Sequence, residues 1–164
     1  MGLKIGISGH GGAGKDEAGK ILAESTTLRY VAGTSKFAEA IVYERWGYQF
    51  YPDVFTCWQD RRSHRQKWAE IIGEFNRDDP VALYRRCLAN QDMLTGIRYE
   101  HEFRACKAAG LVDLWIWIER DVPPDPTMEY TKDDCDFTIE NNGDIASLTR
   151  KLLAIARAWN VVKH

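Results

Sequence analysis

The chain has 164 residues, of which 45% are hydrophobic and 28% are charged, and its formal net charge is −2 at pH 7. This length suits one domain whose core needs no disulfide or metal. The slightly acidic balance argues against the basic surface typical of proteins that bind nucleic-acid polymers. No apolar run approaches the roughly 18 residues of a membrane span. The four widely spaced cysteines predict a reduced, cytoplasmic protein without membrane contact.

The first half of the chain predicts a strand, a glycine-rich turn and then mostly helices. In chain order, we expect a strand over residues 3–7, a helix over 15–24, a strand over 28–31, a helix over 36–46, a loop over 48–60 and a helix around 68–75. The helix over 15–24 follows from Ala18, Ile21 and Leu22, which share one helical face. Gly47 ends the next helix. The last helix follows from apolar side chains at i, i+3, i+4 and i+7 from Trp68.

The second half alternates more regularly between helices and strands. In chain order, we expect a helix over residues 80–87, a strand over 92–95, a helix over 100–109, a strand over 111–118, a flap over 120–134, a strand over 136–139 and a helix over 145–159. Pro80 favours the start of a helix, Gly110 the end of one, and Asp144 is a typical N-cap. The strand over 111–118 is apolar on both faces, which predicts a central position in a parallel sheet.

This alternation predicts an α/β fold in a single domain spanning residues 1–164. We expect about five parallel strands with helices on both faces of the sheet. Residues 120–134 combine Pro123, Pro124 and Pro126 with many charges and few apolar residues, which is typical of a short mobile flap.

A phosphate-binding motif occupies residues 9–16, which read Gly-His-Gly-Gly-Ala-Gly-Lys-Asp. Glycines allow successive N–H groups to face phosphate oxygens, and the following helix adds the positive end of its dipole. Lys15 supplies a charge to the β- and γ-phosphates. The motif predicts a P-loop nucleotide-binding fold with ATP as cofactor. The expected ATP-binding residues are Gly11, Gly12, Ala13, Gly14, Lys15, Asp16 and Glu17.

Asp16 stands where a serine or threonine usually binds Mg²⁺ through its hydroxyl. A carboxylate can also hold Mg²⁺, directly or through water, and we favour Asp16 as the metal residue. The alternative is an acidic residue that only stabilises the start of the helix through its dipole.

Further segments carry a resemblance to a known family. In chain order, they are residues 32–36, the stretch from 65 to 77, residues 95–102, residues 126–129 and residues 136–143. With the phosphate-binding motif, these segments resemble the deoxynucleoside monophosphate kinases of bacteriophages, a branch of the nucleoside monophosphate kinase superfamily. Gly96 departs from the pattern, because many relatives carry an aspartate there that belongs to the Mg²⁺ shell. Asp16 is therefore expected to carry more of the metal binding.

The resemblance implies residues that bind the acceptor. A lysine faces the acceptor nucleotide at position 36, Arg65 and Arg77 belong to an acceptor-binding stretch, and Arg98 with Glu102 matches an Arg-(x)3-Glu element. Trp68 fits the helix core better than a base-stacking position, although both roles are compatible. The expected substrate-binding residues are Lys36, Arg65, Trp68, Arg77, Arg98 and Glu102.

Arginines suit phosphoryl transfer because the guanidinium group binds phosphate bidentately and stays charged. Arg120 begins the flap, so closure of the flap could bring it onto the γ-phosphate. For Arg65, Arg77 and Arg120 the alternative is a solvated or ion-paired surface arginine. The expected catalytic residues are Lys15, Arg98 and Arg120.

The sequence thus predicts a kinase that moves the γ-phosphate of ATP to a (deoxy)nucleoside monophosphate and yields the diphosphate. One alternative is another small-acceptor P-loop kinase, similar to dephospho-coenzyme A kinase. A second alternative is a non-catalytic ATP-binding switch. The resemblance also makes a homodimer plausible and, for a phage-encoded protein, implies the host cytoplasm.

Overall fold

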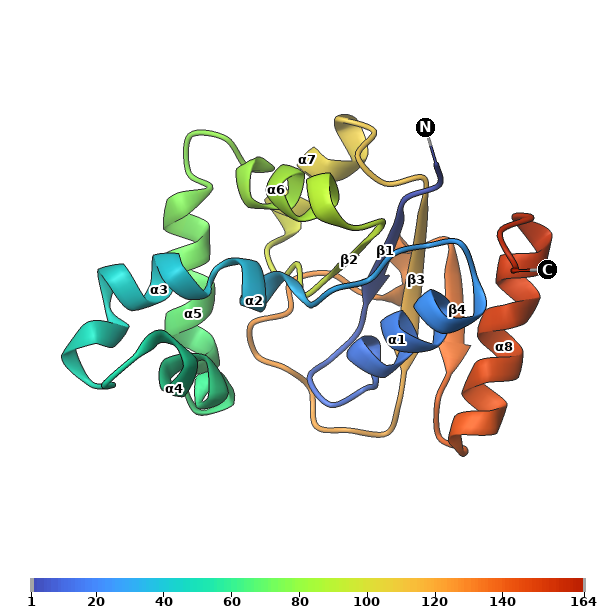
Figure 1. The fold of residues 1–164 in the computed structure, drawn as a ribbon, viewed down its shortest axis with the longest axis horizontal. Coiled ribbons are helices and arrows are strands. Elements are labelled where there is room, and N and C mark those ends of the chain that lie inside the picture. Colours follow the sequence, from blue (N-terminus) through green and yellow to red (C-terminus); the bar gives the residue numbers. More distant parts are fainter. Residues whose placement is uncertain (1, 164) are drawn as a thin grey trace.

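Four parallel strands form the centre of the molecule (Figure 1). The computed structural model describes residues 2–163. The strands are β1 (Ile5–Ser8), β2 (Met93–Thr95), β3 (Leu114–Glu119) and β4 (Phe137–Glu140), and their order in the sheet is β2-β1-β3-β4. The predicted parallel α/β fold and the central place of β3 are confirmed, but the sheet has four strands and not about five.

Helices cover both faces of this sheet (Figure 1). The α-helices within the described part of the chain are α1 (Lys15–Ser25), α2 (Thr34–Phe37), α3 (Glu39–Arg45), α4 (Val54–Gln59), α5 (Arg65–Phe75), α6 (Ala82–Asn90), α7 (Glu100–Ala108) and α8 (Ile145–Ala158). Short 3₁₀ turns lie at η1 (Gly47–Gln49), η2 (Arg61–His64) and η3 (Lys132–Asp134). Helices α1 and α8 pack on one face, and α6 and α7 pack on the other.

Strand β3 is buried on both faces, as its sequence requires. Trp115 and Trp117 pack with α6 and α7, whereas Ile116 and Ile118 pack with α1 and α8. The neighbouring strand β1 accommodates the large indole of Trp115 because Gly6 lies beside it, and a Cβ at Gly6 would overlap the ring. The hydrophobic clusters on the two faces of the sheet therefore both pack against the central strands. These strands position the loops at their carboxyl ends.

The strand expected over residues 28–31 is absent, which accounts for the lower strand count. This segment runs beside β2, but side chains make most of the contacts. Asp92 Oδ2 accepts from the Arg29 N–H at 2.8 Å, and Gln91 Oε1 accepts from the Val31 N–H at 2.8 Å. Between this segment and residues 91–95, the structure has one backbone–backbone hydrogen bond, from the Asp92 N–H to the Arg29 carbonyl. Side-chain oxygens thus replace the ladder of an edge strand.

Asp92→Asn should lower the free energy of unfolding by about 1–3 kcal/mol, because the charged hydrogen bonds from Lys4 and Arg29 are lost. Burial alone raises the pKa of Asp92, but the hydrogen bonds from Arg29 and Lys4 outweigh it and lower the pKa to about 2. The stabilisation is therefore present above the unfolded pKa of 3.8 and is lost as the pH falls towards 2. Urea unfolding at pH 7 and below pH 3 measures both effects. The exposed Asp78 offers Asp78→Asn as a control; an equal change in both variants would contradict the prediction.

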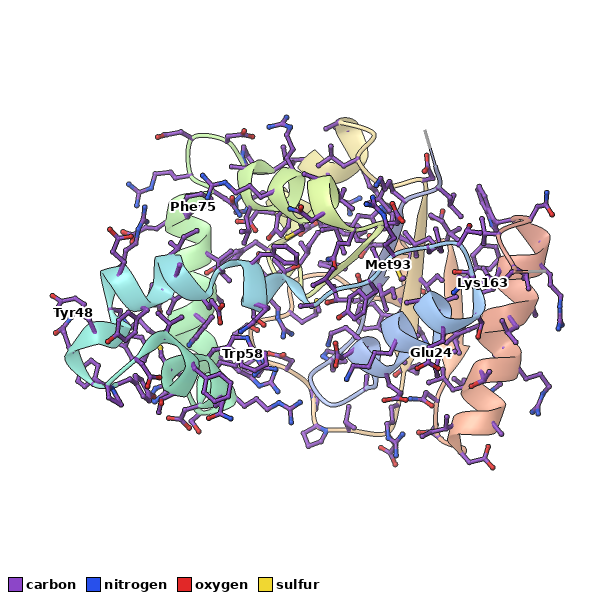
Figure 2. The ribbon with its side chains drawn as sticks, in the orientation of Figure 1. Glu24, Tyr48, Trp58, Phe75, Met93 and Lys163 are labelled. Atoms are coloured by element: carbon purple, nitrogen blue, oxygen red, sulfur yellow. The ribbon has the colours of Figure 1, made fainter. Side chains whose placement is uncertain are left out.

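A helical lobe formed by α3, α4 and α5 extends away from the sheet (Figure 1). Tyr48 lies at its far tip (Figure 2). The loop expected over residues 48–60 contains α4, which begins after Asp53 because the Asp53 carboxylate accepts from the Thr56 N–H at 2.7 Å. The helix expected over 36–46 is divided at Ala38 into α2 and α3. No helix among residues 2–163 is long and apolar enough to cross a membrane.

Candidate active site

The loop between β1 and α1 has the backbone shape of a phosphate-binding loop. Gly12 and Gly14 have φ angles of 83° and 103°, which L side chains rarely adopt. At Gly14 a side chain would also collide with Asn141, because a Cβ there would lie 2.5 Å from Asn141 Nδ2. The same amide donates a hydrogen bond of 2.8 Å to the Ala13 carbonyl. Since Asn141 directly follows β4, the end of that strand holds the loop in place.

The N–H groups of this loop are suited to an anion. The Ala13 N–H bonds back to the His10 carbonyl at 3.1 Å. Within residues 2–163, the structure gives no hydrogen-bond acceptor to the N–H groups of Gly11, Gly12, Gly14, Lys15 and Asp16. A series of free N–H groups at the N-terminus of a helix binds phosphate. The loop therefore fits the triphosphate of ATP. Glu17, the last of the expected ATP-binding residues, is exposed on the first turn of α1.

Lys15 lies over the loop carbonyls. Its Nζ donates to the carbonyl oxygens of Gly9 and His10 at 2.8 and 3.0 Å. Burial lowers the pKa of Lys15 to about 7, and the positive charge of Arg98 adds to this effect, while Asp125 opposes it. A phosphate group at this position would favour the charged form of the lysine.

Arg65 and Arg98 come from separate segments and meet at one carboxylate. Arg65 is the first residue of α5, and Arg98 lies between β2 and α7. Arg65 Nη1 is 3.4 Å from Asp125 Oδ2, and Arg98 Nη1 donates a hydrogen bond to the same oxygen. Arg65 also lies against the phosphate loop, since a Cβ at Gly11 would be 2.6 Å from its Nη1. Together with Lys15, the two guanidinium groups form a cluster of basic side chains beside the loop.

Part of the segment 120–134, which the sequence predicts to be a mobile flap, is packed into this site. Asp125 is 6% exposed and Tyr130 is 3% exposed. Asp125 Oδ1 accepts from the N–H and the hydroxyl of Thr127 at 3.0 and 2.6 Å. The Asp125 N–H donates to His10 Nδ1 at 3.0 Å. The flap was predicted from prolines, charges and few apolar residues, whereas polar contacts to the loop and the arginines hold this part of the segment.

Asp125 and His10 are site residues that the sequence did not single out. Asp125 lies among several acidic residues of the same segment, and no local pattern distinguishes it from them. The sequence did contain a signal for further positive charge near the site, namely the basic stretch over residues 61–67. Arg62 is among the charges that lower the pKa of Lys15, after burial and Arg98, so this stretch contributes to the positive potential of the site.

Asp16 lies in the first turn of α1, where the sequence places the metal residue. Its carboxylate accepts from the Tyr30 hydroxyl at 2.6 Å and pairs with Lys20 at 3.1 Å. Its side chain is 63% exposed. Among residues 2–163, no group of three or more histidine, cysteine, aspartate or glutamate side chains could hold a metal ion by itself. Mg²⁺ needs only one or two carboxylates when phosphates supply further oxygens, so Asp16 fits that role.

Asp16→Asn should weaken the Mg²⁺ dependence of ATP turnover more than the binding of ATP. The phosphates would still meet the N–H groups of the loop, whereas the ion would lose a charged partner. A Mg²⁺ titration of ADP release, beside a titration of nucleotide binding without metal, measures the two effects separately. Glu24→Gln, on the exposed end of the same helix, is the control. An unchanged Mg²⁺ titration would show that Asp16 only stabilises the start of α1.

The lobe and its surroundings contain other expected acceptor residues. Lys36 pairs with Glu39 at 2.7 Å and lies 4.5 Å from the centre of the Trp58 ring, which Arg61 also covers. Arg77 pairs with Glu74 at 3.3 Å. Arg77 also lines an open cleft of about 550 Å³ beside α5, with Lys67, Glu70, Ile71, Gly73, Glu74, Tyr99 and His101. The structure does not bring Lys36 or Arg77 into contact with the carboxylate that joins the two central arginines.

Three further residues contact the protein interior or the end of β4, and of these only Trp68 lies where the sequence favoured it, in the core. Arg120 Nη1 donates to the Asn141 carbonyl at 3.1 Å, so it contacts the end of β4. Trp68 is 4% exposed and lies in the hydrophobic core. Glu102 does not orient Arg98: it is fully buried and accepts from the Tyr84 hydroxyl. These three remain predicted site residues, but their contacts here are with the protein interior or with β4.

Comparison with known proteins identifies the fold. No family model matches the sequence, and no curated protein matches it. Among solved structures, a sugar kinase from Janibacter sp. HTCC2649 is similar over 100% of both chains, with 14% identity and a TM-score of 0.54. The APS kinase of Mycobacterium tuberculosis, solved in complex with AMPPNP and APS, is similar over 95% of this chain and 98% of its own, with 10% identity and a TM-score of 0.52. The fold is therefore that of the P-loop kinases.

Proposed function

We propose that the chain is an ATP-dependent kinase that transfers the γ-phosphoryl group to the phosphate of a (deoxy)nucleoside monophosphate. The meeting of Arg65 and Arg98 beside the phosphate loop carries this proposal. A P-loop alone serves kinases, switches and motors, so a second anion site is the feature that favours transfer between two phosphates. A pair of guanidinium groups suits an acceptor that itself carries a phosphate, because each can bind two oxygens.

In this proposal, one group of residues binds ATP and a second group binds the acceptor. When bound, ATP supplies the phosphoryl group and Mg²⁺ neutralises its phosphate oxygens. The loop N–H groups and Lys15 bind the triphosphate, and Asp16 holds the ion. Arg65 and Arg98 hold the acceptor's phosphate close to the loop, and residues 120–134 exclude water that would otherwise hydrolyse ATP.

The nucleoside part of the acceptor is proposed to follow α5 away from the arginines. Tyr99, next to Arg98, is one wall of the cleft of about 550 Å³. Ligand pockets commonly measure about 300–1,000 Å³, and an aromatic ring suits stacking with a base. Arg77 lines the same cleft and belongs to the stretch that resembles the acceptor-binding segment of the bacteriophage deoxynucleoside monophosphate kinases. This agreement supports a nucleotide acceptor.

A coupled assay of ADP release with a panel of acceptors tests the proposal. The panel holds the four deoxynucleoside monophosphates, two ribonucleoside monophosphates and dephospho-coenzyme A. We expect ADP release to rise sharply with at least one monophosphate and to stay at background without an acceptor. A response to dephospho-coenzyme A alone would indicate a kinase for a hydroxyl acceptor. No response to any acceptor, with ATP still bound, would indicate a nucleotide-binding switch.

A further inference from the structure

We propose that Asp125 occupies the position of the acceptor's phosphate and that the acceptor binds by displacing this carboxylate from Arg65 and Arg98. The inference rests on the proposed function, since it takes the paired arginines as a phosphate site. It adds an exchange step: the acceptor does not enter a site of free cations, but competes with a side chain of the protein itself.

The contacts of Asp125 are those of a bound anion. Its side chain is 1% exposed, and its Oδ2 lies against both guanidinium groups. Its Oδ1 takes two hydrogen bonds from Thr127. The carboxylate therefore receives donors on both oxygens, which is the environment that a phosphate oxyanion needs. Burial by itself raises the pKa of Asp125, but the hydrogen bond from Thr127 and the charge of Arg98 lower it, so the group is an anion at neutral pH.

The charges favour replacement of the Asp125 carboxylate by the acceptor's phosphate over binding of both anions together. Arg65 and Arg98 provide two positive charges at one carboxylate, and Lys15 adds to them when it is protonated. A phosphate dianion placed beside Asp125 would put two anions on the same pair of guanidinium groups, in a site with little water, and they would repel each other. A phosphate that replaces Asp125 brings more charge and more oxygens to the same donors. The arginines thus keep an anionic partner before and after the exchange.

The segment around Asp125 is held at both ends, and only the short stretch between Val122 and Glu129 has room to move. On the carboxyl side, the Glu129 N–H donates to the Arg98 carbonyl at 3.0 Å, and the Tyr130 hydroxyl donates to the Ile97 carbonyl at 2.8 Å. On the amino side, the Asp121 N–H donates to Asn142 Oδ1 at 2.8 Å and Val122 packs against the cluster of α1 and α8. After them, residues 123–124 are exposed prolines that cannot donate backbone hydrogen bonds. Asp125 lies between these two parts. Its release would move the exposed prolines and Asp125 outward, while Val122 and Glu129 stay in place on either side.

A different role for Asp125 predicts the opposite result. If the carboxylate stays in place and only orients the two arginines, its removal would leave the guanidinium groups disordered and would weaken anion binding. Weaker binding would therefore indicate a positioning residue, whereas tighter binding indicates a displaced occupant only together with faster hydrogen exchange in the native chain.

The test compares the native chain with Asp125→Asn and with Asp121→Asn, an exposed aspartate of the same segment, as the control. Inorganic phosphate is the probe, and calorimetry measures its dissociation constant. We expect phosphate to bind Asp125→Asn at least about tenfold more tightly than the native chain, and Asp121→Asn to match the native chain. Hydrogen exchange of residues 121–128 is measured in parallel. In the native chain, phosphate should speed exchange of the Asp125 and Thr127 amides, whose hydrogen bonds the displaced carboxylate gives up.

Each outcome of these measurements supports or overturns the displacement of Asp125 by phosphate. Equal or weaker binding by Asp125→Asn overturns the exchange and indicates a positioning role. Tighter binding without faster exchange in the native chain also overturns it, because the gain would then come from charge alone. If neither protein binds phosphate, the arginine pair is no phosphate site, and the proposed function fails with it. Should Asp125→Asn fail to fold, the exchange measurement on the native chain still decides the proposal.

Discussion

Lys15→Met should reduce ATP-dependent transfer by about a hundredfold or more and, at the same time, make the folded protein more stable. The loss of activity follows from the missing charge on the transferred phosphoryl group, since removal of one preorganised donor commonly costs about 3–4 kcal/mol of transition-state stabilisation. Initial rates of ADP release at saturating ATP measure this effect.

The gain in stability follows from the lowered pKa. Burial, with the charge of Arg98, lowers the pKa of Lys15 from 10.5 to about 7 in the folded protein. The folded state therefore carries a penalty that is complete below pH 7, decreases as the pH rises from 7 to 10.5, and vanishes above that range. Methionine keeps most of the volume of the side chain without the charge. Each kcal/mol recovered should raise Tm by about 2–4 °C in a chain of this size.

Thermal unfolding at pH 6.5 and pH 9.5 tests whether the substitution stabilises the fold and whether this effect decreases with rising pH. The rise in Tm of Lys15→Met should be larger at the lower pH. Lys151→Met, on α8, removes a lysine that bonds to the Glu140 carbonyl and should neither stabilise the fold nor abolish transfer. A Lys15→Met protein that folds normally and turns over ATP at the native rate would contradict the phosphate-loop assignment.

Local patterns predicted much of the fold because their physical causes are local. The helix over 15–24 is α1 in the structure, and the N-cap expected at Asp144 accepts from the Ser147 N–H at 2.8 Å. The apolar strand over 111–118 contains β3 and lies in the centre of the sheet. Periodicity, capping residues and burial on two faces are all visible in a few neighbouring residues.

The expected strand over 28–31 failed for a reason that no local pattern reveals. Its sequence can form a strand, but the edge that it lies against presents the side chains of Gln91 and Asp92. Those side chains satisfy its backbone groups and prevent a regular ladder. The partner lies 60 residues further along the chain, so the outcome depends on tertiary contact.

In the candidate site too, features built from neighbouring residues were predictable, whereas features that depend on tertiary contacts were not. Lys15 and the glycines were predictable from the spacing of the motif, because the loop is built from consecutive residues. The partner of Arg98 was not: the resemblance groups Arg98 with Glu102 in an Arg-(x)3-Glu element, whereas Arg98 bonds to Asp125, 27 residues later. Glu102 instead accepts from Tyr84 inside the core. Which charged residues meet is decided by the packing of the segment 120–134, and sequence spacing holds no information on it.

Arg98→Lys should raise the KM for the monophosphate acceptor by about 10- to 100-fold, with little change in the binding of ATP measured alone. Lysine keeps the charge but offers a single ammonium in place of the planar fork, and a hydrogen bond to a charged group is worth about 1.5–3 kcal/mol. Arg98 meets Asp125 and lies beside the acceptor's proposed phosphate position, so the loss should fall on acceptor binding. Arg98→Ala should raise KM further.

Initial rates over a range of monophosphate concentrations, with ATP saturating, separate KM from kcat. Arg104→Lys is the matched control, because Arg104 lies on the adjacent helix α7 and pairs with Glu100 and Asp134 on the surface. Its kinetics should equal those of the native chain. Tm is recorded for each variant, since Arg98→Ala leaves the buried Asp125 with one guanidinium partner in place of two. Unchanged acceptor kinetics in a folded Arg98→Ala protein would remove the second anion site from the mechanism, and with it the main reason to prefer a monophosphate kinase over a nucleotide-binding switch.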